Sequence, residues 1–387
     1  MSGRAVQTTP ATVLLLADYG GPYAGSFIPA IRAIAKSARA RGLRIECGFT
    51  EIARDRPWLT DLEQDGIPVH FAPGWDRRAL RNWIHTRVAV IGGDIVLHTH
   101  FTAFDLPAAA VARARDDLMV LWHVHSFLPR GPHRWLTSSI KYGWIARAVS
   151  RIICAGSGPA EAIGRRGQAR KTVIVPNGID TDRFAPIDSA ERLVARKSLG
   201  LSLEEPVLLH FSWNWRIKGG PLFSECLARV REQAPNVVGL SVGGGEQASE
   251  AAHALGLSEA LRGLDPDEDV RRFYAAADAL VATSDAEGGA PTFAILEALS
   301  CGLPVVATDI PGHRVEVEKP AALRNGPAVA DRLACLIADV LALDPDQRAA
   351  EGAEASRWVA RHRDLASSAE RIVELYAASL DDRQRRE

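Results

Sequence analysis

The sequence contains few cysteines and no long apolar run. Its five cysteines are scattered over 387 residues and form no C-x-x-C pair. This distribution argues against a disulfide framework and a zinc knuckle, and it favours reduced thiols in a cytoplasm. No apolar run approaches the roughly 18 residues that span a bilayer, and VLLLA near the start has no signal-peptide cleavage pattern after it. These absences predict a cytoplasmic protein, with peripheral contact to the inner face of the membrane as an alternative.

Net charge is also nearly absent, at −1, but its distribution is uneven. Residues 1–184 contain 24 basic and 15 acidic side chains, whereas residues 185–387 contain 22 basic and 32 acidic ones. A basic first half favours an anionic ligand or an anionic membrane surface, although solvated surface accounts for part of any such excess. A chain of 387 residues is too long for one ordinary core, so it indicates two domains and a cleft between them.

The first half alternates short apolar runs with helical stretches. ATVLLLADYGG, from residue 11, has the pattern of a buried parallel strand that ends in a glycine turn, and the helix that follows is closed by Gly42. Further apolar runs recur at a spacing that suits βαβ units: DIVLHTH, LMVLWHVHSF, RIICAGS and KTVIVPNG. This half is predicted to form a doubly wound parallel sheet.

A second series of the same kind follows the turn-rich segment VPNGIDTDRFAP, residues 175–186, which is the best candidate for a domain boundary. Its strands are PVLLHFSW, NVVGLSVGGGE, ADALVATSD and LPVVATD, and the chain beyond Pro345 is helical and ends in an amphipathic stretch. Two open sheets that face each other place the carboxyl ends of their strands at a shared crevice. Functional residues are therefore expected just after strands.

The segment SDAEGGAPTFAILEALSCG follows one of these strands and begins a helix near Pro291 or Thr292 that ends at Gly302. A helix start preceded by small residues exposes backbone N–H groups and a partial positive charge, which suit a phosphate. Glu297 lies too deep in the helix to cap it, and it is placed to accept hydrogen bonds from ribose hydroxyls. The alternative is a solvated Glu297 beside a plain glycine loop.

Two cations follow the first strand of the second half, in HFSWNWRIKGG. Arg216 and Lys218 precede two glycines, an arrangement that brings positive charge to a pyrophosphate at a strand end. Fixed cations there stabilise the negative charge of a departing nucleoside diphosphate. The alternative is a surface loop with an ordinary basic pair.

Two H-x-H pairs end strands of the first half, His98 with His100 and His123 with His125. Alternate positions of a strand share a face, so a four-histidine zinc site is one interpretation. No carboxylate or cysteine accompanies the histidines at ligand spacing, and we therefore expect no metal. One or two of the four are expected to face the cleft, while the others pack or form local hydrogen bonds.

The segment from Leu128 to Ile152 mixes basic and aromatic side chains. Contact with an anionic bilayer or with an acceptor is one interpretation, and the preferred one is a basic helix whose aromatic side chains face the core.

Taken in order, these pieces resemble family 4 glycosyltransferases, retaining enzymes of the GT-B fold that use nucleotide sugars. The resemblance covers nearly the whole chain and rests on Gly20–Gly21, DIVLHTHF, HVHS, VPNGIDTDRF, RIKGG, GGGE, FYAAADALVATS and, most specifically, ILEALSCGLPVVATD. It implies two Rossmann-like doubly wound α/β domains that face a central cleft. Residues 1–182 would bind the acceptor, residues 183–360 would bind the nucleotide sugar, and residues 361–387 would form a helix that crosses back to the first domain.

The resemblance also implies roles for single residues. Glu297 would bind the ribose, Arg216 and Lys218 would face the diphosphate, and His125 would approach the reacting sugar or the acceptor. Gly21 would let the first loop come close to the donor. The residues beside the donor sugar and phosphates would be Glu287, Gly288, Gly289, Ala290, Pro291 and Thr292. The implied catalytic residues are His125, Glu287, Arg216 and Lys218.

Two departures from the family pattern concern these residues. The family separates its two glutamates by seven residues, whereas nine lie between Glu287 and Glu297, and Gly289 stands at the seven-residue position. The loop is therefore longer, or Glu287 has a different role. The family also places an arginine about five residues before the lysine, where this chain has Trp213. Arg216 would then reach the diphosphate from a different angle.

The implied reaction moves a hexose from a nucleotide diphosphate sugar, with uridine as the default base, to a hydroxyl of a glycan, lipid-linked or secondary-metabolite acceptor. The leaving phosphate would help to take the proton, and cations and the helix dipole would stabilise it. No D-x-D clamp is evident in the sequence, so we expect neither a metal nor a cofactor besides the donor, and no nucleic-acid partner. The alternatives are a GT-B sugar-nucleotide epimerase or phosphorolytic enzyme, and a non-catalytic nucleotide-sugar-binding protein.

Overall fold

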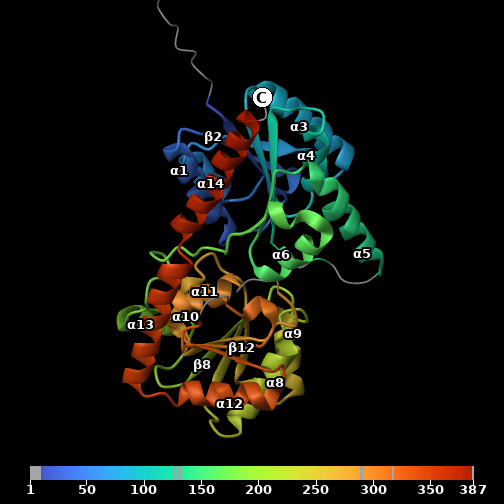
Figure 1. The fold of residues 1–387 in the computed structure, drawn as a ribbon. Helices are drawn as coiled ribbons and strands as arrows, with labels where there is room; N and C mark the ends of the chain where they lie inside the picture. The colour runs from blue at the N-terminus through green and yellow to red at the C-terminus, as the bar shows by residue number, and fades with distance from the viewer. Residues whose placement is uncertain (1–9, 126–127, 129–131, 288–291, 316–317, 386–387) are drawn as a thin grey trace, which may run out of the picture. The chain divides into compact units, whose positions relative to one another are not determined.

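The computed structural model describes residues 10–125, 128, 132–287, 292–315 and 318–385. They form two compact units, one of Met1–Pro176 with Ala366–Glu387 and one of Asn177–Leu365 (Figure 1). The chain leaves the first unit within the VPNGID motif and returns to it after Leu365. Each unit has its own parallel sheet and its own apolar core.

The first unit contains a seven-stranded parallel sheet in the order β3-β2-β1-β4-β5-β6-β7. The strands are β1 (Thr12–Ala17), β2 (Arg44–Thr50), β3 (Val69–Ala72), β4 (Ile95–His100), β5 (Leu118–Val124), β6 (Arg151–Cys154) and β7 (Thr172–Ile174). β1, β4 and β5 are buried along their whole length. Burial on both faces is what their nearly continuous apolar sequences predict for central strands of a parallel sheet.

Helices cover both faces of this sheet, and the alternation of side chains along each strand divides the apolar core in two. The helices of the unit are α1 (Phe27–Ala40), α2 (Leu59–Gln64), α3 (Arg77–Ile91), α4 (Asp105–Ala112), α5 (Pro132–Ser139), α6 (Ser157–Ile163) and α14 (Leu365–Gln384). Val13 and Leu15 pack with α1, α2 and α14, whereas Leu14 and Leu16 pack with α3 and α4. Figure 1 shows α14 beside α1, although the two helices are far apart in the sequence.

The second unit contains a six-stranded parallel sheet in the order β10-β9-β8-β11-β12-β13. Its strands are β8 (Val207–Phe211), β9 (Val238–Val242), β10 (Leu261–Leu264), β11 (Ala279–Ala282), β12 (Val305–Thr308) and β13 (Leu323–Gly326). Its helices are α7 (Ser189–Ser198), α8 (Gly220–Arg231), α9 (Gly245–Ala254), α10 (Arg271–Ala276), α11 (Phe293–Ser300), α12 (Ala330–Leu341) and α13 (Pro345–His362). α7, α10, α11 and α13 pack on one core, and α8, α9 and α12 on the other.

The strand order reverses once in each sheet. In the first unit β1 lies between β2 and β4, and in the second unit β8 lies between β9 and β11. The chain therefore builds each sheet outward in one direction and then in the other. Open sheets of this kind bind ligands beyond the carboxyl ends of the strands that flank this reversal. The loops after β1 and β4, and those after β8 and β11, are the places where a site is expected.

Two predictions from the sequence are confirmed by this architecture. Both halves form doubly wound parallel sheets. The helix expected to begin near Pro291 or Thr292 is α11, and Gly302 follows it with a φ of +77°, the left-handed conformation that closes many helices. Among the residues that the structure describes, no helix is both long enough and apolar enough to cross a membrane.

Candidate functional site

Lys218 and Glu287, in the loops after β8 and β11 of the second unit, form an ion pair. The Lys218 Nζ lies 2.6 Å from Glu287 Oε1, and the two side chains are only 15% and 11% exposed. The hydroxyl of Ser284 donates to the same carboxylate oxygen. The cation expected to face a diphosphate is thus held by an internal carboxylate, which a phosphate would have to displace.

The backbone that presents Lys218 is fixed by close contacts. Gly219 has a φ of +71°, and a Cβ there would lie 1.9 Å from the carbonyl oxygen of Thr283. The hydroxyl of Thr283 donates to the carbonyls of Lys218 and Gly219, at 3.1 and 2.8 Å. His210 Nε2 lies 3.0 Å from the Lys218 carbonyl and donates to it. The glycine after Lys218 is therefore required both by conformation and by the approach of the neighbouring strand end.

His313 is a part of this site that the sequence did not single out. It follows β12, is fully buried, and places Nε2 4.0 Å from Glu287 Oε1. Its Nδ1 donates to the Thr308 carbonyl at 3.0 Å. Burial lowers the pKa of His313 to about 4, so the imidazole is neutral beside Glu287 at pH 7. The only signal in the sequence was its position shortly after a predicted strand.

Glu297 lies in α11, where Tyr274 of α10 holds its carboxylate. The Tyr274 hydroxyl donates to Glu297 Oε2 at 2.7 Å, and Glu297 is only 7% exposed. Burial, and secondly the charge of Glu297, raise the pKa of Tyr274 well above its usual value, so the phenol keeps its proton. A buried, oriented carboxylate contradicts the alternative of a solvated Glu297.

The other predicted donor residues differ in how the structure places them. Arg216 is exposed, and its side chain forms no hydrogen bond or ion pair among the described residues. Trp213 is 72% exposed, and the Lys218 ammonium lies 5.5 Å from the centre of its ring. Thr292 is the residue immediately before α11. Gly288, Gly289, Ala290 and Pro291 lie outside the described residues.

In the first unit, Gly21 and His125 follow β1 and β5. The Gly21 carbonyl accepts a hydrogen bond from Trp58 Nε1 at 2.9 Å, and a Cβ on Gly21 would lie 2.9 Å from the Tyr19 hydroxyl. His125 is half-buried, and burial lowers its pKa to about 4. Its ring lies 5.0 Å from that of Phe101, which has a φ of +66° directly after β4. A positive φ is rare for a bulky residue and indicates local strain beside the strand ends.

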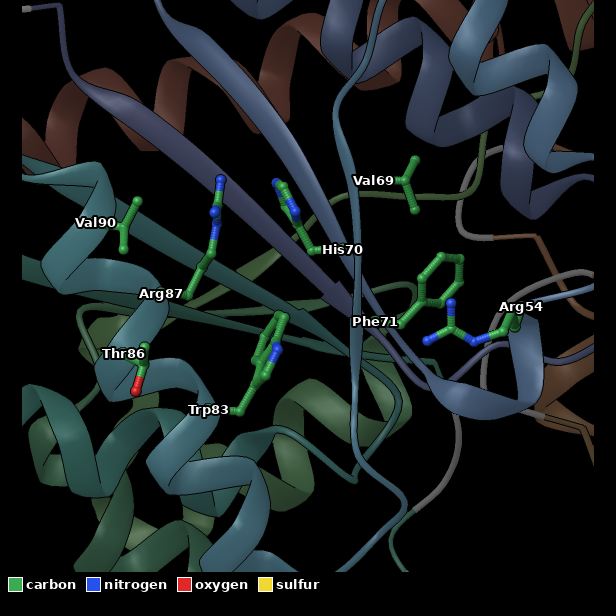
Figure 2. Close-up of a pocket in the computed structure, with 8 residues that line it drawn as sticks. All are labelled: Arg54, Val69, His70, Phe71, Trp83, Thr86, Arg87 and Val90. Carbon is green, nitrogen blue, oxygen red and sulfur yellow. The ribbon is translucent and has the colours of Figure 1, made fainter.

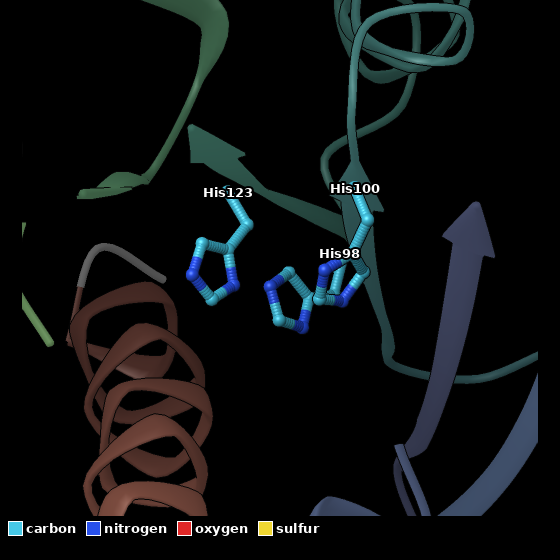
Figure 3. A group of neighbouring side chains, drawn as sticks. All are labelled: His98, His100 and His123. Carbon is cyan, nitrogen blue, oxygen red and sulfur yellow. The ribbon is translucent and has the colours of Figure 1, made fainter. Parts of the chain in front are cut away.

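The other three histidines of the two H-x-H pairs form a buried group (Figure 3). His98, His100 and His123 each offer a ring nitrogen, and these nitrogens all lie within 4.8 Å of one another. Burial lowers the pKa of all three well below the usual value, so they are neutral. The structure therefore brings together the histidines that the sequence paired, and His125 lies beside them with Nε2 3.0 Å from His100 Nδ1.

A surface pocket lies apart from these residues, between β3 and α3 (Figure 2). Arg87 and His70 both point toward it, and both contact the carboxylate of Glu46, at 2.5 and 3.1 Å. It is lined by Arg54, Val69, His70, Phe71, Trp83, Thr86, Arg87 and Val90. None of the predicted site residues takes part in it.

Two doubly wound parallel sheets define a class of open α/β proteins that bind ligands beyond the carboxyl ends of their strands. Comparison with known families identifies the class further. Residues 30–183 match the family model described as Glycosyltransferase Family 4, and residues 205–343 match that of Glycosyl transferases group 1. A D-inositol 3-phosphate glycosyltransferase of Xylanimonas cellulosilytica is 30% identical in an alignment 401 positions long that covers 91% of each chain. The chain belongs to the family 4 glycosyltransferases, as the resemblance predicted.

Other relatives match over a shorter part of their length. A GDP-mannose-dependent alpha-(1-6)-phosphatidylinositol monomannoside mannosyltransferase of Mycolicibacterium smegmatis is 32% identical in an alignment 225 positions long that covers 54% of this chain and 57% of that protein. For this relative and four further ones, the chain spans 35% to 60% of the relative's length. The crystal structure of Anabaena HepE with UDP-glucose has a TM-score of 0.78 at 23% identity and covers 95% of this chain and 99% of HepE. That likeness supports the GT-B fold class.

Proposed function

We propose that this protein is a retaining hexosyltransferase that moves a hexose from a nucleoside diphosphate sugar, by default a UDP-sugar, to an acceptor hydroxyl. One observation carries the proposal: the second unit places the Lys218–Glu287 pair where its strand order reverses, and it buries Glu297 of α11 against Tyr274. The names of similar proteins support a UDP or GDP donor, since one is GDP-mannose-dependent and another binds UDP-glucose.

In this proposal the residues of the second unit bind the donor. Glu297, oriented by Tyr274, accepts hydrogen bonds from the ribose hydroxyls. Lys218 releases Glu287 and binds the diphosphate instead, and Arg216 adds a second cation. The backbone around Gly288–Thr292, in which Pro291 has no N–H group, completes the phosphate contacts. Positive charge placed in advance at the departing oxygen is the largest contribution that such a site offers to catalysis.

The chemical step follows from this arrangement. The acceptor oxygen bonds to the anomeric carbon on the face from which the diphosphate leaves, and the acceptor proton passes to the departing phosphate oxygen. Glu287, released from Lys218, would lie beside the donor sugar. We assign acceptor binding to the first unit, with neutral His125 near the reacting sugar and Gly21 allowing close approach of the first loop. No cofactor besides the donor is required in this scheme.

The acceptor class is a glycan, a lipid-linked sugar or a small hydroxyl compound. The name of the mycobacterial relative, whose acceptor is a phosphatidylinositol mannoside, favours the lipid-linked class and peripheral contact with a membrane. The thiols of Cys47, Cys154, Cys226, Cys301 and Cys335 are all free, which supports a cytoplasmic location.

Thermal stabilisation by a panel of UDP-, GDP- and ADP-sugars tests the donor site. A donor at 100 times its Kd stabilises the fold by about 2.7 kcal/mol, which raises Tm by roughly 5–10 °C for a domain of this size. Lys218→Ala and Glu297→Ala should lose this shift, and Lys197→Ala, an exposed lysine of α7, should keep it. If no nucleotide sugar stabilises the wild type, the proposed function is wrong.

Transfer to a panel of acceptors distinguishes the alternatives. Sugar transfer with an unchanged anomeric configuration supports the proposal. A rearranged or phosphorolysed sugar that forms without any acceptor would instead identify an epimerase or a phosphorolytic enzyme. Binding without any product, across donors and acceptors, would identify a non-catalytic binding protein.

A further inference from the structure

The buried histidine group of the first unit contains ring nitrogens that the protein does not satisfy. His98 Nε2, His100 Nε2 and both ring nitrogens of His123 have no hydrogen-bond partner within the described part of the chain. His98 and His100 are 0% and 2% exposed, and His123 is 6% exposed. A buried polar atom without a partner costs about 1–3 kcal/mol. Several such atoms in one place indicate a partner that is not part of the polypeptide.

The strands themselves place the three rings together. His98 and His100 are alternate residues of β4 and so share a face of the sheet. His100 is the register partner of His123 on the adjacent parallel strand β5. Figure 3 shows the three imidazoles gathered at these strand ends. The ring centres of His98 and His100 are 4.2 Å apart, and those of His100 and His123 are 5.0 Å apart.

The distances suit a metal ion after small rotations of the side chains. The nitrogens lie within 4.8 Å of one another, and a tetrahedral zinc ion with Zn–N bonds of about 2.0–2.1 Å holds its ligand atoms about 3.3 Å apart. Three histidines with a water in the fourth position form a known type of zinc site, so a carboxylate or thiolate is not needed. Neutral imidazole is the form that binds a metal.

Two of the rings are also held by partners on their outer nitrogens. The Tyr376 hydroxyl of α14 lies 2.6 Å from His98 Nδ1, and His125 Nε2 lies 3.0 Å from His100 Nδ1. In both rings this contact leaves Nε2 as the unpartnered nitrogen. Histidines that bind a metal usually form such a hydrogen bond through the other ring nitrogen, which fixes the tautomer and the ring orientation.

We propose that His98, His100 and His123 bind one zinc ion that ties the ends of β4 and β5 together within the first unit. The ion replaces the missing partners of the buried nitrogens, and Tyr376 and His125 orient two of its ligands. The site is separate from the donor residues of the second unit and does not depend on the proposed transfer reaction. It revises the expectation from the sequence that these histidines bind no metal.

Metal analysis of the full chain, purified with a tag that contains no histidine, tests the site. After incubation with Zn²⁺ and dialysis, the wild type should retain about one zinc per chain, and His123→Gln should retain less than about a tenth of that amount. The matched control is His85→Gln, because His85 is an exposed histidine of α3 in the same unit. Wild-type protein that retains no zinc, or His123→Gln that retains as much as the control, would overturn the proposal.

Cobalt provides a measurement that does not depend on a folded variant. Titration of wild-type protein with Co²⁺ should give the visible absorption bands of a tetrahedral ion, saturating at one equivalent, and the bands should disappear on addition of Zn²⁺. Tyr376→Phe should bind the ion about 10–100-fold more weakly, because it removes the partner of His98. If the wild-type titration shows no saturable band, the zinc site is refuted. If Tyr376→Phe has unchanged affinity, the assigned role of Tyr376 in orienting His98 is wrong.

Discussion

The ion pair of Lys218 with Glu287 predicts a competition between an internal carboxylate and the donor. A diphosphate that binds Lys218 must first replace a carboxylate oxygen 2.6 Å from the ammonium. Glu287→Gln removes the competing charge and nearly preserves the shape of the side chain. A charge-assisted hydrogen bond contributes about 1.5–3 kcal/mol and a neutral one about 0.5–1.5 kcal/mol, so the variant lowers the cost of release by about 1 kcal/mol. We expect UDP to bind about fivefold more tightly to Glu287→Gln than to wild type.

Lys218→Met should have the opposite effect. It removes the cation and leaves a carboxylate that is only 11% exposed. Among the described residues the remaining ion-pair partner of this carboxylate is His313, at 4.0 Å, and its ring is neutral. Removal of one partner of a buried ion pair lowers the free energy of unfolding by about 3–5 kcal/mol. The residual exposure of both side chains favours the lower end of that range. UDP affinity should fall at least about tenfold.

Isothermal titration with UDP and with UDP-glucose separates the two roles of Glu287. If Glu287 reaches the donor sugar, Glu287→Gln should bind UDP more tightly than wild type does. It should lose the additional affinity that the glucose gives to UDP-glucose, and it should lose the transfer activity. Glu250→Gln and Lys197→Met change exposed residues of the same unit and should match wild type. The reasoning is refuted if Glu287→Gln weakens UDP binding as much as Lys218→Met does, since Glu287 would then support Lys218 and not compete with the phosphate.

Three further predictions concern the packing of the second unit. A double-mutant cycle of Tyr274→Phe and Glu297→Gln, followed by urea unfolding, should give a coupling free energy of about 1.5–3 kcal/mol; a value near zero would contradict the oriented carboxylate. Gly219→Ala should lower the free energy of unfolding by more than about 3 kcal/mol, because its Cβ would lie 1.9 Å from a carbonyl oxygen. The control is Gly256→Ala, since Gly256 has a similar φ of +68° and no atom within 4 Å of its Cβ. This change should lower the free energy of unfolding by only about 1 kcal/mol. His313 has a pKa of about 4 in the folded protein, below the usual 6.5, so the unfolded chain binds more protons and stability should fall by up to about 3 kcal/mol as pH falls from 6.5 to 4. His313→Asn should flatten this part of the pH profile, and an unchanged slope would count against the neutral buried imidazole.

Local signals in the sequence were sufficient to predict the strands and the helix that carry the site. The apolar residues of β1, β4 and β5 predicted buried parallel strands, and Gly302 marked the end of α11. These predictions held because helix ends and strand patterns depend on residues that are neighbours in the sequence. Lys218 and Glu287, which the sequence singled out, follow β8 and β11, and a doubly wound sheet binds ligands at strand ends whatever its detailed sequence.

Contacts between distant segments could not be predicted from the sequence. Lys218 and Glu287 meet because β8 and β11 are adjacent, and that adjacency follows from the order of the whole sheet. His98 meets Tyr376 across 278 positions of the chain. Periodicity predicted that His98 and His100 share a face, but it gave no information on which strand or helix would lie opposite. Partners of buried polar groups are therefore the part of a site that requires the fold.

The same contacts bear on the unusual spacing between Glu287 and Glu297. Glu287 is anchored on the side of β11, by Lys218 and Ser284, and by an approach to Gly312 so close that a Cβ there would lie 2.2 Å from its own. Glu297 is anchored separately, by the position of α11 against Tyr274. Because each carboxylate is held by partners outside the segment that joins them, two additional residues in that segment do not by themselves displace either one. The unusual spacing is thus compatible with a role of Glu287 at the donor. Gly312, which has no side chain, leaves the space that Glu287 occupies.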